Sequence, residues 1–195
     1  MKRKRVARFG IAGLVLASSM AVIAPAHADG AVLLRVGSVQ LWDELQQLDG
    51  NPRAFEDSSS RTFSVAWEAR KRRGAAFGIE YLIYRHDFTP GTLITSQGQA
   101  KTQALMFRAT KYFGGADVRP FIGIGFGPGH TSVSGTNLDP ELNLMIQAAA
   151  GVEFRVENFS FLVEARGLYN DSDGEVGNEY DPSATGYFGG IGFLF

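Results

Sequence analysis

Segments that alternate apolar and polar side chains recur along most of this sequence, and they constrain its fold more than any other feature. In residues 62–70, Phe63, Val65, Trp67 and Ala69 share one parity and leave Glu68 and other polar residues on the opposite one. A period of two is that of an extended strand, whose successive side chains point to opposite faces. Eight such segments are predicted, at residues 31–42, 62–70, 77–86, 101–113, 118–127, 142–156, 159–169 and 184–195.

The connections between these segments alternate in length. Short links at 71–74, 114–117 and 157–158 predict tight hairpins. Longer polar stretches occur at 43–60, 88–100, 128–141 and 170–183. Short turns on one side and long loops on the other are typical of outer-membrane barrels. The sequence therefore predicts an all-β fold, an eight-stranded antiparallel up-and-down transmembrane β-barrel. Because the number of strands is even, both termini of the barrel are expected on the side of the short turns.

The two faces of the predicted strands indicate what surrounds the barrel. A soluble barrel places its apolar residues inside, whereas here the face opposite the apolar stripe carries charges and glycines. Four acids and four arginines are expected to pair across a narrow lumen, namely Glu68, Arg70, Glu80, Arg108, Glu153, Arg155, Glu164 and Arg166. Glycines of the same parity, such as Gly123 and Gly190, are expected to leave room for the long arginines. The apolar face is therefore expected to meet lipid.

The first 28 residues have the three parts of a secretory signal: a basic run, an apolar run and the small-residue pattern Ala26-His27-Ala28. We expect cleavage before Asp29, which leaves residues 29–195 as one barrel domain. This segment holds five of the 19 Lys and Arg residues and none of the 20 acids, so the remainder has a formal charge of 14 − 20 = −6. Such a charge disfavours nucleic acid as a partner. The chain has no cysteine, which excludes disulfides and thiolate sites.

The last strand ends on alternating aromatic and aliphatic residues. Tyr187, Ile191, Phe193 and the terminal Phe195 look like the C-terminal signature read by the barrel assembly machinery. Together with residues 119–127, 150–154 and 187–195, they resemble the small outer-membrane barrel superfamily that includes the opacity proteins and outer membrane proteins A and X. The resemblance implies a Gram-negative outer-membrane location, with membrane lipid and lipopolysaccharide as surroundings and no cofactor. Members serve as adhesins, envelope stabilisers, small pores and lipid-modifying enzymes, so no single activity follows.

One short motif points to catalysis. His130-Thr131-Ser132 is similar to the His-x-Ser motif of lipid A deacylases, with Glu141 or Asp139 as the acid. Val133 stands where that family has Asn, and Pro128 and Gly129 are expected to disturb the strand parity that aims the pair. The alternative is a polar loop edge without catalytic function.

An acidic segment near the last long loop raises the question of a metal. Asp171, Asp173 and Glu175 lie close together, and calcium favours such oxygen ligands. The spacing of a calcium-binding loop is incomplete, and the alternative is a solvated acidic loop. Acidic residues in the first long loop add to an acidic outer mouth. No metal or cofactor is assigned from the sequence.

Aromatic residues near strand ends are expected to form interfacial girdles; they are Trp42, Phe88, Tyr112, Phe113, Phe159, Tyr169 and Tyr187.

The leading hypothesis is an integral outer-membrane barrel without catalysis, which supports the envelope or binds an unidentified surface ligand through four polar loops. The alternatives are a deacylase-like lipid A hydrolase that uses His130 and Ser132, and a small porin-like pore.

Overall fold

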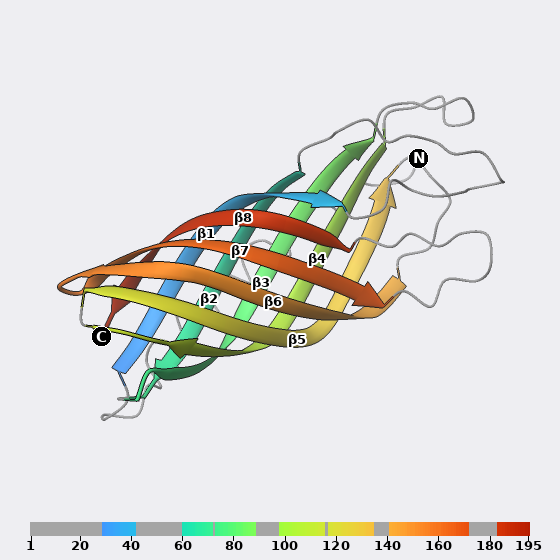
Figure 1. Cartoon of the computed structure of the whole chain (residues 1–195). Helices are drawn as coiled ribbons and strands as arrows, with labels where there is room; N and C mark the ends of the chain where they lie inside the picture. Colours follow the sequence, from blue (N-terminus) through green and yellow to red (C-terminus); the bar gives the residue numbers. More distant parts are fainter. Residues whose placement is uncertain are drawn as a thin grey trace, which may run out of the picture.

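The computed structural model describes residues 29–41, 60–71, 73–88, 98–115, 117–134, 141–171 and 183–195. They form one closed barrel of eight antiparallel strands in sequence order (Figure 1). The strands are β1 (Asp29–Leu41), β2 (Ser60–Arg70), β3 (Ala75–Phe88), β4 (Gly98–Tyr112), β5 (Val118–Ser134), β6 (Glu141–Val156), β7 (Phe159–Asp171) and β8 (Ala184–Leu194). The predicted eight-stranded antiparallel barrel is confirmed. The described residues include no helix long and apolar enough to cross a membrane.

The barrel closes where the first strand meets the last. The Gly30 N–H donates to the Phe195 carbonyl at 2.6 Å, and the Phe195 N–H donates to the Gly30 carbonyl at 3.0 Å. Pairing of β1 with β8 then continues as far as Leu41 and Ala184. Every strand thus has two hydrogen-bonded neighbours, which removes the exposed edges that invite aggregation.

The two ends of the barrel differ in their connections. At one end, here called the turn end, tight turns join β2 to β3, β4 to β5 and β6 to β7, and β1 begins beside the end of β8. Two of these turns use glycines with positive φ, Gly74 at 77° and Gly114 at 87°, a conformation that L-residues seldom adopt. The opposite end is called the loop end, and the residues that connect strands there lie outside the described ranges.

Most strands extend beyond their predicted bounds, and β5 differs most. It continues to Ser134, so residues 128–134, predicted as loop, are strand. The expectation that Pro128 and Gly129 disturb the parity is wrong: Gly127 and Gly129 face inward, and Pro128 faces outward like Phe126. Pairing with β6 runs through Pro128, while that with β4 passes from Phe126 to Gly129 without a change of register. Proline lacks an N–H, and the strand tolerates it because the neighbouring ladder maintains the alignment.

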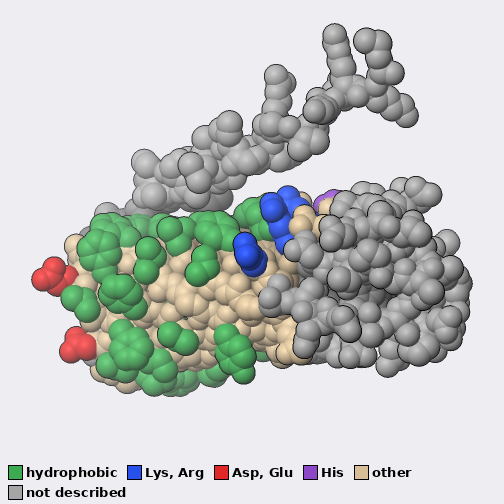
Figure 2. Space-filling model, turned by 90° about the horizontal axis from the view of Figure 1, so that it is seen from above, with side chains coloured by type: hydrophobic (Ala, Val, Ile, Leu, Met, Phe, Trp, Pro, Cys, Tyr) green, Lys and Arg blue, Asp and Glu red, His purple; other side chains and the backbone are tan. Residues whose placement is uncertain are grey.

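The outward face of the barrel is apolar. Twenty-five large apolar side chains are exposed on the described residues, among them Ile124, Val163 and Phe107. Figure 2 shows these side chains spread along the wall, with charged side chains confined to its two ends in that view. The patch is far larger than a water-soluble monomer ordinarily exposes.

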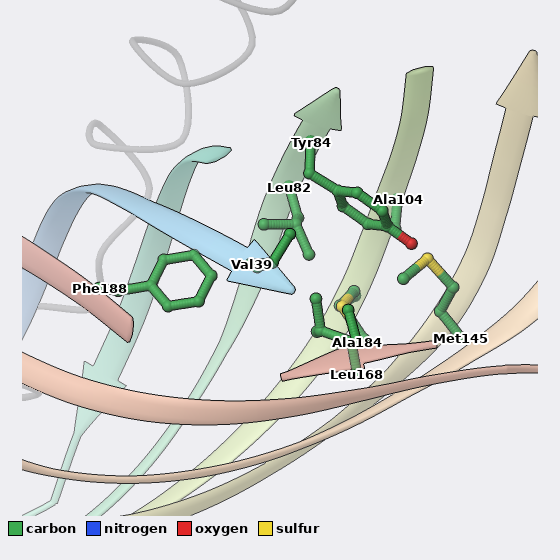
Figure 3. Close-up of a cluster of buried hydrophobic side chains, with 9 residues drawn as sticks. Val39, Leu82, Tyr84, Ala104, Met145, Leu168, Ala184 and Phe188 are labelled. Atoms are coloured by element: carbon green, nitrogen blue, oxygen red, sulfur yellow. The ribbon is translucent and has the colours of Figure 1, made fainter. Parts of the chain in front are cut away.

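The inward face has a layered composition. Charged residues lie in the middle of the lumen and towards the turn end, together with small apolar clusters around Leu33 and Phe121. Towards the loop end, apolar side chains close the lumen; this apolar layer consists of Val39, Leu82, Tyr84, Ala104, Met106, Met145, Leu168, Ala184 and Phe188. Figure 3 shows its members projecting inward from several strands towards one another.

Candidate functional site

The middle of the lumen holds a compact group of five buried ions and one buried amide, here called the charge layer: Arg35, Glu80, Arg108, Glu164 and Arg166, with Gln147. Glu80 lies 2.8 Å from Arg166 Nη1, 3.1 Å from Arg108 Nη1 and 3.3 Å from Arg35 Nη1. It also accepts a hydrogen bond from Gln147 Nε2 at 3.0 Å. One carboxylate thus contacts three guanidiniums that come from β1, β4 and β7.

Glu164 is the second anion of the charge layer. Arg108 Nη2 and Arg35 Nε each lie 3.0 Å from its oxygens, and Arg166 donates to it from Nε at 2.8 Å. The glycines of neighbouring strands make this packing feasible. A Cβ on Gly190 would lie 2.9 Å from Arg35 Cγ, closer than side chains pack. Gly190 therefore gives Arg35 the room that the sequence analysis expected of inward glycines.

A second group, here called the mouth cluster, lies nearer the turn end and consists of Glu68, Arg70, Tyr112, Arg119, Glu153 and Arg155. Arg70 donates to Glu153 at 2.7 Å and to the Tyr112 hydroxyl at 3.1 Å, and that hydroxyl donates to Glu68 at 2.8 Å. The Arg70 and Arg119 guanidinium carbons each lie 4.7 Å from the centroid of the Tyr112 ring. Arg155 Nε donates to Glu153 at 3.0 Å.

Arg35 connects the two groups, because its Nη2 lies 3.7 Å from Glu68 while its other nitrogens face the charge layer. The predicted lumen residues therefore lie in one chain of contacts. The set of buried arginines differs from the prediction by one member, because Arg35 is buried and Arg155 is not. Four acids and four arginines are buried: Glu68, Glu80, Glu153, Glu164, Arg35, Arg70, Arg108 and Arg166. Arg155, predicted among them, is 25% exposed at the mouth.

Three polar participants besides Arg35 were missed: Arg119, Tyr112 and Gln147. Tyr112 was predicted in the outer girdle, but it faces inward and is buried; the even parity it shares with Arg108 was the available signal. Gln147 donates to Glu80 and accepts from Arg166 Nη1 at 3.2 Å. A single neutral Gln gives no sign in the sequence that it contacts buried ions. Its role follows only from the strand pairing, which brings it beside Glu80 and Arg166.

The catalytic candidates lie at the loop end of β5. His130 and Ser132 share the outward face and are partly exposed. Among the described side chains, Ser132 donates to the Lys101 carbonyl at 3.4 Å rather than to His130. Glu141 pairs through its backbone with Thr131, but its side chain is not described, and Asp139 lies outside the described residues. The structure thus places the imidazole and hydroxyl on one face and assembles no triad among the described residues.

The remaining sequence-derived candidates are distributed as follows. Tyr187, Ile191, Phe193 and Phe195 are all exposed on the outer wall, and Phe193 packs edge-on against Phe159 with ring centroids 5.7 Å apart. Asp171 is the last residue of β7 and its side chain is not described. Asp173, Glu175 and the predicted signal at 1–28 lie outside the described residues. No cluster of metal-ligating side chains occurs within the described ranges.

A row of three cations, here called the cation row, runs across the outer wall near the loop end. Arg61 of β2 pairs with Arg85 of β3, and Arg85 pairs with Lys101 of β4. All three share the parity of outward neighbours such as Phe63 and Ile83. Directly opposed side chains in a sheet lie about 5 Å apart, where like charges repel. No carboxylate among the described residues forms a salt bridge with this row.

Comparison with known proteins finds similarity in structure but not in sequence. No protein-family model matches the sequence, and no curated protein matches it. OprG of Pseudomonas aeruginosa superposes with a TM-score of 0.59 at 14% identity, over 86% of this chain and 96% of OprG. Neisserial surface protein A gives 0.58 at 13% identity, over 86% and 97%. Ail, the attachment invasion locus protein of Yersinia pestis, gives 0.55 at 16% identity, over 86% and 99%. The chain therefore has the fold of these small outer-membrane barrels.

Proposed function

We propose that this chain is an integral outer-membrane barrel of a Gram-negative envelope, that it has no catalytic function, and that it acts through its loop end. The observation that carries this proposal is the inverted distribution of side chains. Large apolar residues cover the outside, and the buried charges are inside. Transfer of the charged lumen face to lipid would cost several kcal/mol for each ion, so the outward wall is the face that suits a bilayer. The similar structures are consistent with this location.

The closed lumen supports a structural or binding role over transport. The charge layer and the apolar layer occupy the lumen in succession, and eight strands leave little space for a channel. The acidic loops at 43–60 and 170–183 would then present the binding surface for an unidentified ligand. Their sequences give composition but no recognisable ligand motif.

The location is tested by expressing the full chain and separating the membranes. We expect the protein in the outer-membrane fraction, with faster gel migration before boiling than after it. The intact mass should correspond to a chain that begins at Asp29. A protein that stays monomeric and soluble without detergent contradicts the proposal.

We further propose lipopolysaccharide as the neighbour of the cation row. The three cations at the loop-end margin of the apolar wall have no salt bridge to a described side chain, and they suit the phosphates of an anionic outer leaflet. The Arg61→Gln/Arg85→Gln variant should retain less lipopolysaccharide in native mass spectrometry than the parent protein. Lys71→Gln/Lys111→Gln removes two cations from the opposite margin and serves as the matched control. Equal retention by both variants contradicts this assignment.

The C-terminal residues support a third proposal, recognition by the barrel assembly machinery. Phe195 pairs with Gly30 and exposes its ring on the outer wall. Phe195→Ala should reduce the amount of assembled, heat-modifiable protein in cells. Phe161→Ala, which removes an outward ring from the adjacent strand β7, is the control. An equal yield of the two variants argues against a C-terminal signal.

A lipid A hydrolase remains the second candidate, because His130 and Ser132 share an outward face beside the expected outer leaflet. The test is lipid A mass spectrometry after expression of the parent, His130→Ala and Ser132→Ala. Loss of an acyl chain that requires both residues supports hydrolysis. Unchanged lipid A in all three strains, or activity that survives both substitutions, excludes it.

A further inference from the structure

A basic cavity opens at the turn end, between the β2–β3 and β4–β5 turns. It has a volume of about 510 Å³, within the range of small-ligand pockets. Its described lining includes six cationic residues and no Asp or Glu: Arg70, Lys71, Arg73, Lys111, Arg119 and Arg155. We name this feature the basic pocket.

Among the described side chains, the cations of the basic pocket outnumber the carboxylates that contact them. The buried acids of the lumen are already matched by four buried arginines, so Arg119 and Arg155 are in excess. Both share the single carboxylate of Glu153 with Arg70, and Arg119 Nη1 is as far as 3.9 Å from it. Within the described side chains, three guanidiniums at the mouth therefore share one carboxylate.

The outer side of the basic pocket has no carboxylate partner within the described residues. Lys111 Nζ donates to the Arg73 carbonyl at 2.6 Å, which fixes the ammonium but leaves its charge uncompensated. Lys71 Nζ lies 5.5 Å from the centroid of the Phe77 ring. Lys71 and Lys111 share the outward parity of Phe77 and Phe113, whose rings are exposed. The ammonium groups therefore stand at the margin of the apolar wall.

The turns give the basic pocket a defined frame. The Gly74 N–H donates to the Lys71 carbonyl at 2.9 Å, and the Gly74 carbonyl accepts from the Tyr112 N–H at 2.7 Å. A Cβ on Gly74 would lie 2.4 Å from the Tyr112 carbonyl oxygen, so the close approach of the two turns requires glycine. The cations are thus held together by paired backbone rather than by a loose loop.

From this arrangement we propose that the basic pocket binds the phosphate of an anionic glycerophospholipid headgroup in the periplasmic leaflet. Guanidinium and ammonium groups are the usual protein partners of phosphate. The lipid is favoured over a free ion because the cations adjoin exposed Phe77 and Phe113, along which an acyl chain packs. The inference rests on the proposed membrane location, which assigns the turn end to the periplasm.

The test uses the full chain folded in zwitterionic phosphocholine micelles, after heat-modifiable migration has shown that it is folded and inserted. Backbone amide NMR follows titration with dihexanoyl phosphatidylglycerol, dihexanoyl phosphatidylcholine or inorganic phosphate. We expect phosphatidylglycerol to shift the amides of Gly74, Gly114 and Gly115, with phosphatidylcholine much weaker. Lys71→Gln/Lys111→Gln should weaken that binding by roughly thirtyfold, as expected for two cations at an anionic lipid.

Arg61→Gln/Arg85→Gln is the matched control, since it removes two outward cations from the loop end and should leave this affinity unchanged. Equal binding of the two lipids, or binding that both double variants weaken alike, overturns the proposal. Saturation by inorganic phosphate without a preference for phosphatidylglycerol identifies a free-phosphate site and also overturns the lipid assignment. A chain that does not insert into micelles contradicts the membrane location instead, which keeps the two failures distinct.

Discussion

The charge layer and the apolar layer lie next to each other in the same lumen and have opposite chemistry. On several strands the next inward-facing residue after a member of the charge layer already belongs to the apolar layer. Glu80 is followed by Leu82 on β3, and Arg166 by Leu168 on β7. In the charge layer each ion requires a partner at a particular distance, because an unpaired buried charge is costly. In the apolar layer, a side chain needs only the right shape and volume to pack closely with its neighbours. The stability of the charge layer therefore depends on specific ion pairs, and that of the apolar layer depends on close packing.

The largest expected effect comes from breaking the charge layer at Glu80. Glu80→Gln removes one charge with little change in volume and leaves three guanidiniums around Glu164 alone. We expect a loss of about 4 kcal/mol in the free energy of unfolding, typical of a buried ion that loses its counter-charge. Urea titration of protein folded in lipid vesicles measures it. Glu157→Gln, at an exposed turn, is the control, and equal midpoints for the two variants would refute the role of Glu80.

The apolar layer should be less sensitive to the loss of one member. Leu82→Ala leaves a cavity among Tyr84, Met106 and their neighbours, and we expect a cost of about 3 kcal/mol in the same titration. Leu105→Ala removes an equal volume from the outward wall of β4 and should cost less, because lipid fills the space. A cost for Leu105→Ala equal to that for Leu82→Ala would argue that Leu82 does not lie in a closed core.

The same contrast explains how far the sequence predicts this molecule. Strand parity was evident where apolar and charged residues alternate, as in Thr62 to Arg70, so the barrel and most lumen charges follow from the sequence. Where a strand has apolar residues on both faces, the alternation of apolar and polar side chains disappears, and parity does not show which face points inward. Leu33 faces inward and Leu34 outward, which concealed the inward position of Arg35 in β1. The apolar layer was not predicted for a different reason: parity places Met106 on the inward face, but it does not show that inward apolar residues of several strands lie at the same height in the lumen.

The catalytic candidate shows another limit of sequence analysis. Proline and glycine at 128 and 129 are ordinary signals of a loop, but pairing with β6 continues through both. The geometry there is set by the neighbouring strand and not by local preference.

The contact between the two layers should contribute a smaller amount. The Arg166 guanidinium carbon lies 4.3 Å from the centroid of the Phe188 ring, which links an ion of one layer to the packing of the other. Phe188→Leu keeps an apolar side chain but removes the ring, with an expected cost of about 1.5 kcal/mol. Tyr187→Leu, on the opposite face of β8, is the control. A Phe188→Leu midpoint that matches the control would show that the cation–π contact adds no stability.

The smallest expected effect is on ion conductance, where the two layers act redundantly. Planar bilayers that contain the parent protein should show no unitary currents, because each layer alone fills its section of the lumen. Leu82→Ala/Met106→Ala opens space only towards the loop end and should remain silent, since the paired ions of the charge layer still occupy the middle. Currents in the double variant would mean that the apolar layer is the sole barrier. Currents in the parent protein would instead support the small-pore hypothesis and require a lumen that opens in the bilayer.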